Sequence, residues 1–141
     1  MSDSTAQNKA LIRRWFDEVW NQGRTEMIDE VLSPDCVIHG LQNEKGESVQ
    51  GASGFRGFHT LFREAFPDIK VTVEDTVAEG DLIVARCSVS GKHTGNSLGI
   101  SASNAPIDFD GIAIVRVRDG KFVEAWNSFD FLKMNQQIGI I

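Results

Sequence analysis

The sequence predicts an α+β domain in which helices pack on one face of a curved antiparallel sheet. Apolar residues recur at helical spacing in the first half of the chain, up to Pro67. After Pro67 apolar and polar residues alternate, as they do in half-buried strands. Helices followed by strands are typical of this fold class. The 141 residues fit a single domain, residues 1–141, without a linker or an internal repeat.

Three helices are predicted before Pro67. Residues 7–21 carry the strongest signal, one broad apolar face made by Leu11, Ile12, Trp15, Phe16, Val19 and Trp20. A short amphipathic helix follows Gly23 and ends before Pro34, so the two form a hairpin. Residues 35–40 predict a short apolar strand and residues 43–51 a polar loop. The third helix, residues 55–66, has a strongly aromatic face.

The second half predicts a meander of strands. Residues 69–73 alternate, residues 78–81 form a turn, and residues 82–91 are rich in β-branched side chains. Two more strands flank Asp119 and Gly120, a favoured pair for a two-residue hairpin turn.

Two non-strand segments complete the second half. Residues 93–106 are rich in Ser, Gly and Asn and predict a flexible loop that could cover a site. Residues 131–137 predict a terminal helix that ends before Gly139.

Composition and missing motifs narrow the function. With 14 basic and 20 acidic side chains the net charge is -6, which disfavours nucleic acid and anionic membranes as partners. The N-terminal residues lack the pattern of a signal peptide, so we expect a cytoplasmic protein. Cys36 and Cys87 lack the spacing of a zinc or redox motif, and we expect two buried thiols.

Nucleotide-binding and hydrolase signatures are also absent, and the three histidines show no metal-ligand spacing. We therefore expect no metal and no cofactor. General acid-base catalysis or ligand binding remains.

The stretch EAWNSFDFLKMNQQIG, residues 124–139, places one carboxylate, Asp130, where a strand changes to a helix. Alternation puts Trp126, Ser128 and Asp130 on one side of the strand. A tryptophan beside a carboxylate provides an apolar setting that makes the carboxylate a better base. Alternatively, Asp130 or Ser128 caps the terminal helix. Both interpretations stay open.

The histidines allow similar alternatives. His39 ends an apolar strand, where it could hydrogen-bond a ligand or lie at the rim of the core. His93 stands at the mouth of the long loop, as a pocket-lining or a solvated residue. His59 lies among phenylalanines, which favours packing.

Several short motifs together are similar to those of the SnoaL-like polyketide cyclases: VWNQG, AFPD, EGD, GKHTG and the terminal DGK, W, D and QQIG pattern. The resemblance covers nearly the whole chain. It implies the fold of the nuclear transport factor two and ketosteroid isomerase superfamily, a cone-shaped α+β barrel with a pocket between helices and sheet. It also implies a cofactor-free intramolecular aldol condensation of a polyketide ester.

The same resemblance implies roles for five residues. Asp130 matches the catalytic base, His39 and His93 match histidines that could hydrogen-bond substrate oxygens, and Trp20 and Trp126 match pocket positions. The implied partners are a small apolar or aromatic carbonyl-containing substrate and further copies of the chain, in a homodimer or homotetramer. The loop sequence SASNAP departs from the family pattern, where Pro-Pro or Thr-Gly is frequent.

Other functions fit this fold. Because the chain contains no tyrosine, the oxyanion hole of ketosteroid isomerase, which needs one, is not available. A hydrolase or dehydratase could use an Asp-Arg cluster, although these charges also suit ordinary cross-strand pairing. The candidate cluster is Asp108, Asp110, Arg86 and Arg116. A non-catalytic ligand-binding dimer module is the third alternative.

Overall fold

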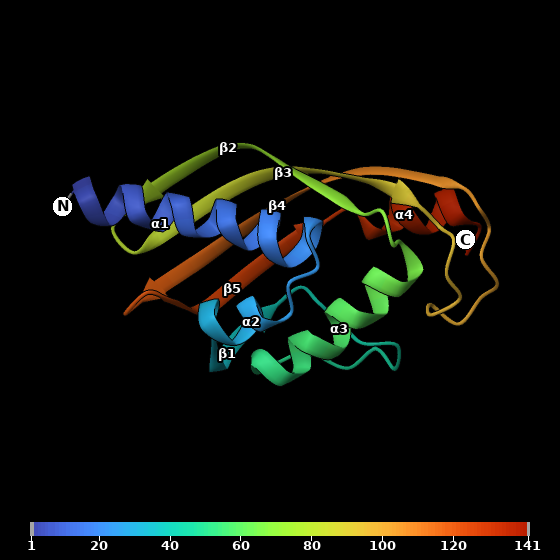
Figure 1. Cartoon of the computed structure of the whole chain (residues 1–141), viewed down its shortest axis with the longest axis horizontal. Coiled ribbons are helices and arrows are strands. Elements are labelled where there is room, and N and C mark those ends of the chain that lie inside the picture. Colours follow the sequence, from blue (N-terminus) through green and yellow to red (C-terminus); the bar gives the residue numbers. More distant parts are fainter. Residues whose placement is uncertain (1, 141) are drawn as a thin grey trace.

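The computed structural model describes residues 2–140, and its elements follow the predicted order of helices and then strands (Figure 1). The elements in chain order are α1 (Ser2–Arg14), η1 (Trp15–Asn21), α2 (Glu26–Val31), β1 (Leu32–His39), α3 (Gly51–Ala65), β2 (Lys70–Glu79), β3 (Leu82–Lys92), β4 (Pro106–Arg118), β5 (Lys121–Phe129) and α4 (Phe131–Ile138). The α+β class is therefore confirmed.

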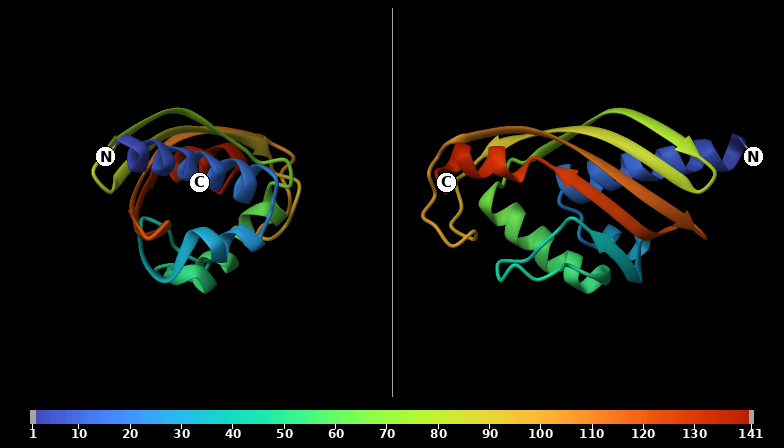
Figure 2. Two further views of the ribbon diagram at one scale, coloured as in Figure 1. Left: turned by 60° about the vertical axis from the view of Figure 1, so that its left-hand side comes forward. Right: turned by 180° about the vertical axis from the view of Figure 1, so that it is seen from behind.

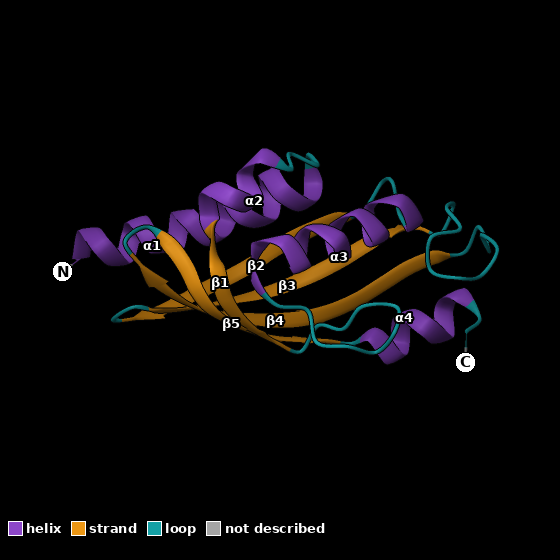
Figure 3. Cartoon of the chain, turned by 90° about the horizontal axis from the view of Figure 1, so that it is seen from below, coloured by secondary structure: helices purple, strands orange, loops and turns teal. Residues whose placement is uncertain are grey.

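The five strands form one curved sheet in the order β1-β5-β4-β3-β2. Helices α1 to α3 lie against its concave face, and α4 extends beyond the end of β5 (Figure 3). The view turned by 60° shows the sheet curling around the space that the helices close (Figure 2). This arrangement matches the cone-shaped barrel that the resemblance implies.

The prediction of a wholly antiparallel sheet is wrong at one edge. Strands β2 to β5 pair antiparallel, but β1 pairs parallel with β5, placing His39 opposite Trp126. Parallel neighbours need a long connection between them, and here the chain from α3 to β4 supplies it. Alternation of apolar residues carries no information on strand direction, so the sequence pattern could not reveal this pairing.

The first predicted helix begins earlier than expected, at Ser2, and changes to a π-helix at Trp15. The carbonyls near its C-terminus accept hydrogen bonds from side chains of α3. His59 Nε2 donates to Val19 O at 2.6 Å, and Arg63 Nη1 donates to Trp20 O at 3.0 Å. These carbonyls have no partner within the helix, and donors near a helix C-terminus also interact favourably with its dipole. His59 is buried, in agreement with the packing role that its neighbours favoured.

The structure contains the predicted hairpin turn and the predicted end of the terminal helix. Asp119 and Gly120 have φ values of 53° and 76°, as a two-residue hairpin with two left-handed residues requires. Gly139 ends α4 with a φ of 86°. Strand β1 starts before the predicted residue 35 and includes Pro34, which an edge strand tolerates because one side of its backbone is unpaired.

Both cysteines are buried free thiols, as predicted. Burial raises the pKa of Cys36 to about 11 and that of Cys87 to about 12. Among the described residues, no three His, Cys, Asp or Glu side chains are grouped as a metal ion would require. Over the same residues, no helix is both long and apolar enough to cross a membrane.

Candidate active site

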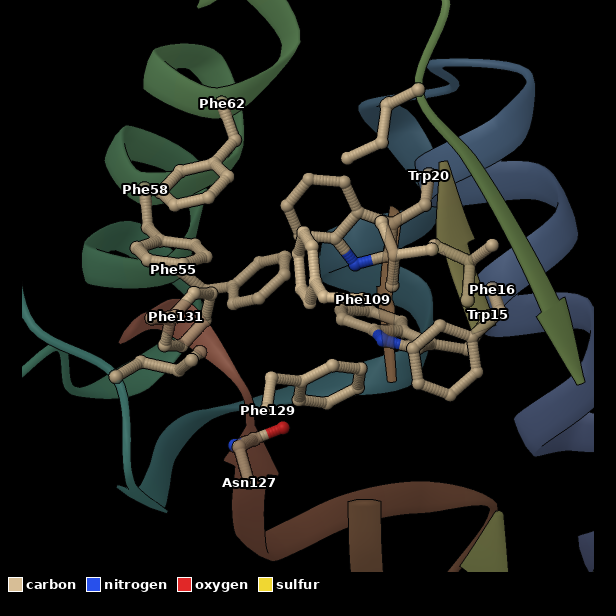
Figure 4. A pocket seen from close by; sticks show the side chains of 14 residues that line it. Trp15, Phe16, Trp20, Phe55, Phe58, Phe62, Phe109, Asn127, Phe129 and Phe131 are labelled. Carbon is tan, nitrogen blue, oxygen red and sulfur yellow. The ribbon is translucent and has the colours of Figure 1, made fainter. Parts of the chain in front are cut away.

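An apolar cavity of about 60 Å³ lies between the helices and the concave face of the sheet (Figure 4). Its lining is mostly aromatic: Trp15, Phe16, Trp20, Leu41, Phe55, Phe58, Phe62, Ile69, Val71, Val89, Phe109, Asn127, Phe129 and Phe131. Asn127 supplies the one amide in this described lining, which contains no charged side chain. The cavity therefore suits a small apolar group of a ligand.

The helical spacing of residues in α3 and the alternation of residues in β5 place these side chains around the cavity. Phe55, Phe58 and Phe62 are three or four residues apart and so share one face of α3. On β5, Asn127 and Phe129 are two residues apart and share the concave face of the sheet. The helical face and the strand face meet across the cavity.

A wider groove opens outside the cavity, with a volume of about 520 Å³. The segment that follows β1, helix α3, the long loop and helix α4 all contribute side chains to it. Leu41, Phe58, Phe62 and Phe131 line both spaces, so the groove and the cavity adjoin each other. The long loop takes part through Leu98, which agrees with the expectation that this loop covers a site.

Asn127 is held by the backbone of β1. Its Nδ2 donates to His39 O at 3.1 Å, and since a carbonyl only accepts, this bond fixes the orientation of the amide. The Oδ1 atom then faces the cavity (Figure 4). Gly40 makes the approach possible, because a Cβ at this residue would lie 1.9 Å from Asn127 O.

Asp130 does not line the cavity or the groove. It is exposed and caps α4, with its Oδ1 accepting from Lys133 N at 3.0 Å. Its own backbone N donates to Asp110 O at 3.0 Å. The capping interpretation of this carboxylate therefore describes the observed geometry.

His39 and Trp126 lie together on the outer face of the sheet. Their rings stack with centroids 5.4 Å apart, and His39 Nε2 contacts Glu124 Oε2 at 2.8 Å. The side chain of His39 is 45 % exposed. Because Trp126 alternates with Asn127, it points away from the cavity, and the structure does not bring these two residues to the site.

His93 is fully buried at the base of the long loop. Its Nδ1 accepts from Ser103 N at 3.1 Å and lies 2.9 Å from Ser103 Oγ, and its ring packs on Phe66. Nearby, the backbone N–H groups of Thr94 and Gly95 both donate to Ala65 O. His93 therefore anchors the loop to the core. Of the five predicted site residues, Trp20 is the one that lines the cavity.

The charges on the sheet pair locally. Arg86 binds Asp75 at 3.0 Å and Arg116 binds Asp81 at 2.9 Å. The backbone of Asp108 instead pairs with the side chain of Gln137. Gln137 Nε2 donates to Asp108 O, and Gln137 Oε1 accepts from Asp108 N, both at 2.9 Å. These contacts are the ordinary charge pairing that the sequence allowed. Among the described residues no salt bridge joins Arg86 or Arg116 to Asp108 or Asp110, although Asp75 and, to a smaller extent, Asp110 raise the pKa of Arg86.

The family model of the SnoaL-like polyketide cyclases matches residues 10–138. The chain belongs to this family. Among curated relatives it is similar to the aklanonic acid methyl ester cyclase DnrD of Streptomyces peucetius, with 26 % identity over 92 % of this chain and 88 % of the relative.

Two solved structures have the same fold as this family member. TsrD from Streptomyces laurentii has a TM-score of 0.82 and 28 % identity, covering 96 % of this chain and 97 % of that one. IdmH from Streptomyces antibioticus has a TM-score of 0.80 and 32 % identity, covering 94 % of this chain and 99 % of that one.

Sequence reasoning missed Asn127 and Phe131 as site residues. Phe131 directly follows the strand-to-helix change at Asp130, and Asn127 is an amide between Ala125 and Phe129 on one face of the strand. An amide among alternating apolar residues is a usable signal, because a buried polar group requires a partner.

Proposed function

We propose that this SnoaL-like family member is a cofactor-free cyclase that closes a ring of an aromatic polyketide ester by intramolecular aldol condensation. The observation that carries the proposal is the aromatic cavity with a wider groove beside it. An apolar, water-poor site strengthens the electrostatic interactions made within it and protects a reactive enolate from water. The activity in the name of DnrD, cyclisation of aklanonic acid methyl ester, supports the same reaction class.

The sizes of the two spaces indicate how such a substrate lies. Pockets for drug-sized ligands are about 300–1,000 Å³. The cavity of about 60 Å³ is too small for a ring system, whereas the groove of about 520 Å³ is large enough. The rings would occupy the groove against Phe58, Phe62 and Phe131, and one substituent would enter the cavity.

For the general base we propose Asp130. It matches the family position of the base, and its neighbours Phe129 and Phe131 both line the cavity. One carboxylate oxygen accepts the N–H of Lys133, and the other has no hydrogen bond within the described part of the chain. Because Asp130 lines neither the groove nor the cavity, the acidic carbon of the substrate has to reach the carboxylate at the start of α4, beyond the lining of both spaces.

Two substitutions separate catalysis from capping. Asp130→Asn keeps the cap, because Asn caps a helix about as well as Asp, but it removes the base. We expect its turnover of an aromatic β-keto ester with a second carbonyl to fall by about a hundredfold or more, with little change in melting temperature. Asp130→Ala should lose the same activity and also about 1 kcal/mol of stability.

Ser128→Ala is the matched control, since Ser128 is an exposed polar residue two positions before Asp130. It should change neither rate nor melting temperature. Full turnover by Asp130→Asn would contradict the proposed base and leave Asp130 as a structural cap.

A non-catalytic binding module is the second candidate. The observation that favours it is the absence of a titratable side chain from the described lining of the cavity. Tight binding of the β-keto ester by the wild-type protein without any ring closure would support this function over the cyclase.

We also propose that the chain forms a homodimer or homotetramer through the outer face of the sheet. Val37, Val77 and Ile112 are large exposed apolar side chains on β1, β2 and β4, and the partly buried Trp126 lies on the same face. Such a face resembles a surface that is covered in an assembly. Light scattering should give at least twice the monomer mass at tens of micromolar, and a monomer alone would count against the proposal.

A further inference from the structure

The groove beside the cavity is lined by apolar and by polar side chains that come from different segments. The apolar ones come mostly from α3 and α4, and the polar ones mostly from residues 42–48, between β1 and α3. Glu44 is the one titratable side chain in the described lining of the groove, and the described lining of the cavity contains none. Within these two linings a ligand can therefore meet a charged side chain only at Glu44.

The turn that carries Glu44 is ordered by hydrogen bonds of Asn43. Asn43 Oδ1 accepts from Lys45 N at 2.9 Å and from Glu47 N at 3.0 Å. Asn43 N also donates to Glu47 O at 2.9 Å, and a single β-bridge closes the turn at its base. The backbone at Glu44 is thus held in place before any ligand binds, which lowers the entropy cost of binding.

The carboxylate of Glu44 makes no hydrogen bond and no ion pair within the described part of the chain. Its neighbours in the lining of the groove differ in this respect. Asn43 Nδ2 donates to Glu47 Oε1 at 3.1 Å. Ser48 Oγ accepts from Gln50 Nε2 at 2.6 Å. These two side chains are engaged within the protein, whereas Glu44 is available to a ligand.

The chemistry of a carboxylate specifies the group that it can bind. An ionised carboxylate only accepts hydrogen bonds, so Glu44 favours a ligand that presents a donor. Neither described lining contains Lys, Arg or His, so a negatively charged group would meet Glu44 without a counter-charge. When a poly-β-keto chain forms an aromatic ring, enolisation of its keto groups leaves phenolic hydroxyls. A phenolic O–H is therefore the donor that suits the proposed class of substrate.

We infer that Glu44 is a specificity residue of the groove, whose carboxylate accepts a hydrogen bond from a phenolic hydroxyl on the part of the ring system that lies away from the cavity. The side chains that line both spaces mark the end of the groove next to the cavity, and Glu44 lines the groove alone. The volume of about 520 Å³ holds a fused ring system between these two regions. The inference rests on the proposed function for the substrate class, but it concerns binding.

Three aromatic ketones that have no second carbonyl test the inference without turnover. They are 2-acetonaphthone, its 6-hydroxy derivative and its 6-methoxy derivative. All three have the same fused rings and the same acetyl group, and only the 6-hydroxy probe has a donor at the opposite end of the rings. Isothermal titration, at a pH at which the naphthol keeps its proton, gives the dissociation constant of each probe.

We expect the 6-hydroxy probe to bind the wild-type protein at least about fivefold more tightly than either other probe, because hydrogen bonds to a charged acceptor are the stronger ones. Glu44→Ala should abolish this advantage. Glu44→Gln should reduce it without abolishing it, since the neutral amide oxygen still accepts. Both variants should melt at the wild-type temperature, because the carboxylate has no partner in the described protein.

Glu47→Gln is the matched control. It removes one negative charge from the same turn, its amide oxygen can still accept from Asn43 Nδ2, and Glu47 is absent from the described lining of the groove. The preference for the 6-hydroxy probe should be the same in this variant as in the wild type.

Equal or unmeasurable affinities of the wild-type protein for the three probes would overturn the inference, and so would a preference that Glu44→Ala leaves intact. Equal losses in Glu44→Gln and Glu47→Gln would assign the preference to the net charge of the turn and would overturn it as well. A preference for the 6-hydroxy probe without ring closure of the β-keto ester would refute the cyclase alone. Ring closure without that preference would refute the role of Glu44 alone.

Discussion

The side chain of Gln137 in α4 hydrogen-bonds to the backbone of β4. Its removal should therefore weaken the attachment of α4 to the sheet. Its amide donates to Asp108 O and accepts from Asp108 N, both at 2.9 Å, as a neighbouring strand would. Each such bond contributes a net of about 0.5–1.5 kcal/mol, and partial exposure favours the lower half of that range. Gln137→Ala should therefore reduce the free energy of unfolding by about 1–2 kcal/mol.

For a chain of 141 residues, 1 kcal/mol corresponds to about 3–4 °C in melting temperature. The variant should melt about 3–8 °C below the wild type in circular dichroism. Gln136→Ala is the matched control, since Gln136 is exposed on the same helix. Amide hydrogen exchange should also accelerate in α4 and at Asp108 in the Gln137 variant alone. Equal melting temperatures for both variants would refute the role of this side chain.

Two further predictions concern Gly40 and His59. Gly40→Ala should cost more than about 2 kcal/mol in urea unfolding, because φ is 90° and the Cβ would lie 1.9 Å from Asn127 O. Gly46→Ala, with a φ of 75° and nothing within 4 Å of the Cβ, should cost clearly less, and equal losses would contradict the clash. Burial lowers the pKa of His59 below its ordinary 6.5, so the unfolded chain binds a proton first and stability should fall as the pH drops below about 6.5. His59→Gln should make urea-derived stability depend less on pH between 7 and 5, and an unchanged slope would refute this.

The sequence predicted those elements that are determined by interactions among residues close together in the chain. The phenylalanines of α3 repeat at helical spacing, and the Asp119-Gly120 pair has the left-handed preference that a tight hairpin demands. The terminal helix has an N-cap at Asp130, one of the two interpretations that the sequence left open, and the predicted end at Gly139. Each of these signals acts within a few residues, so one sequence is enough to recognise it.

The features that depend on distant partners were not predicted. The parallel pairing of β1 with β5 joins segments more than eighty residues apart, and no local pattern encodes it. The π-helix at Trp15 is stabilised partly by His59 and Arg63 of α3, which cap its C-terminal carbonyls from outside the helix. In both cases a tertiary contact decides between local conformations of similar energy.

The site residues on β5 show the limit of alternation most clearly. Alternation groups Trp126 with Asp130 and, separately, Asn127 with Phe129, but it does not say which pair faces the cavity. The partner strand decides: Phe129 pairs with Gly111, where a Cβ would lie 2.1 Å from the Phe129 ring.

A side chain at residue 111 would exclude that ring from the concave face. The glycine on β4 therefore makes room for Phe129 and Asn127 inside and leaves Trp126 outside. Asp130, the N-cap of α4, is likewise absent from the lining of the cavity and of the groove, so a base at this residue has to meet its substrate beside the start of α4.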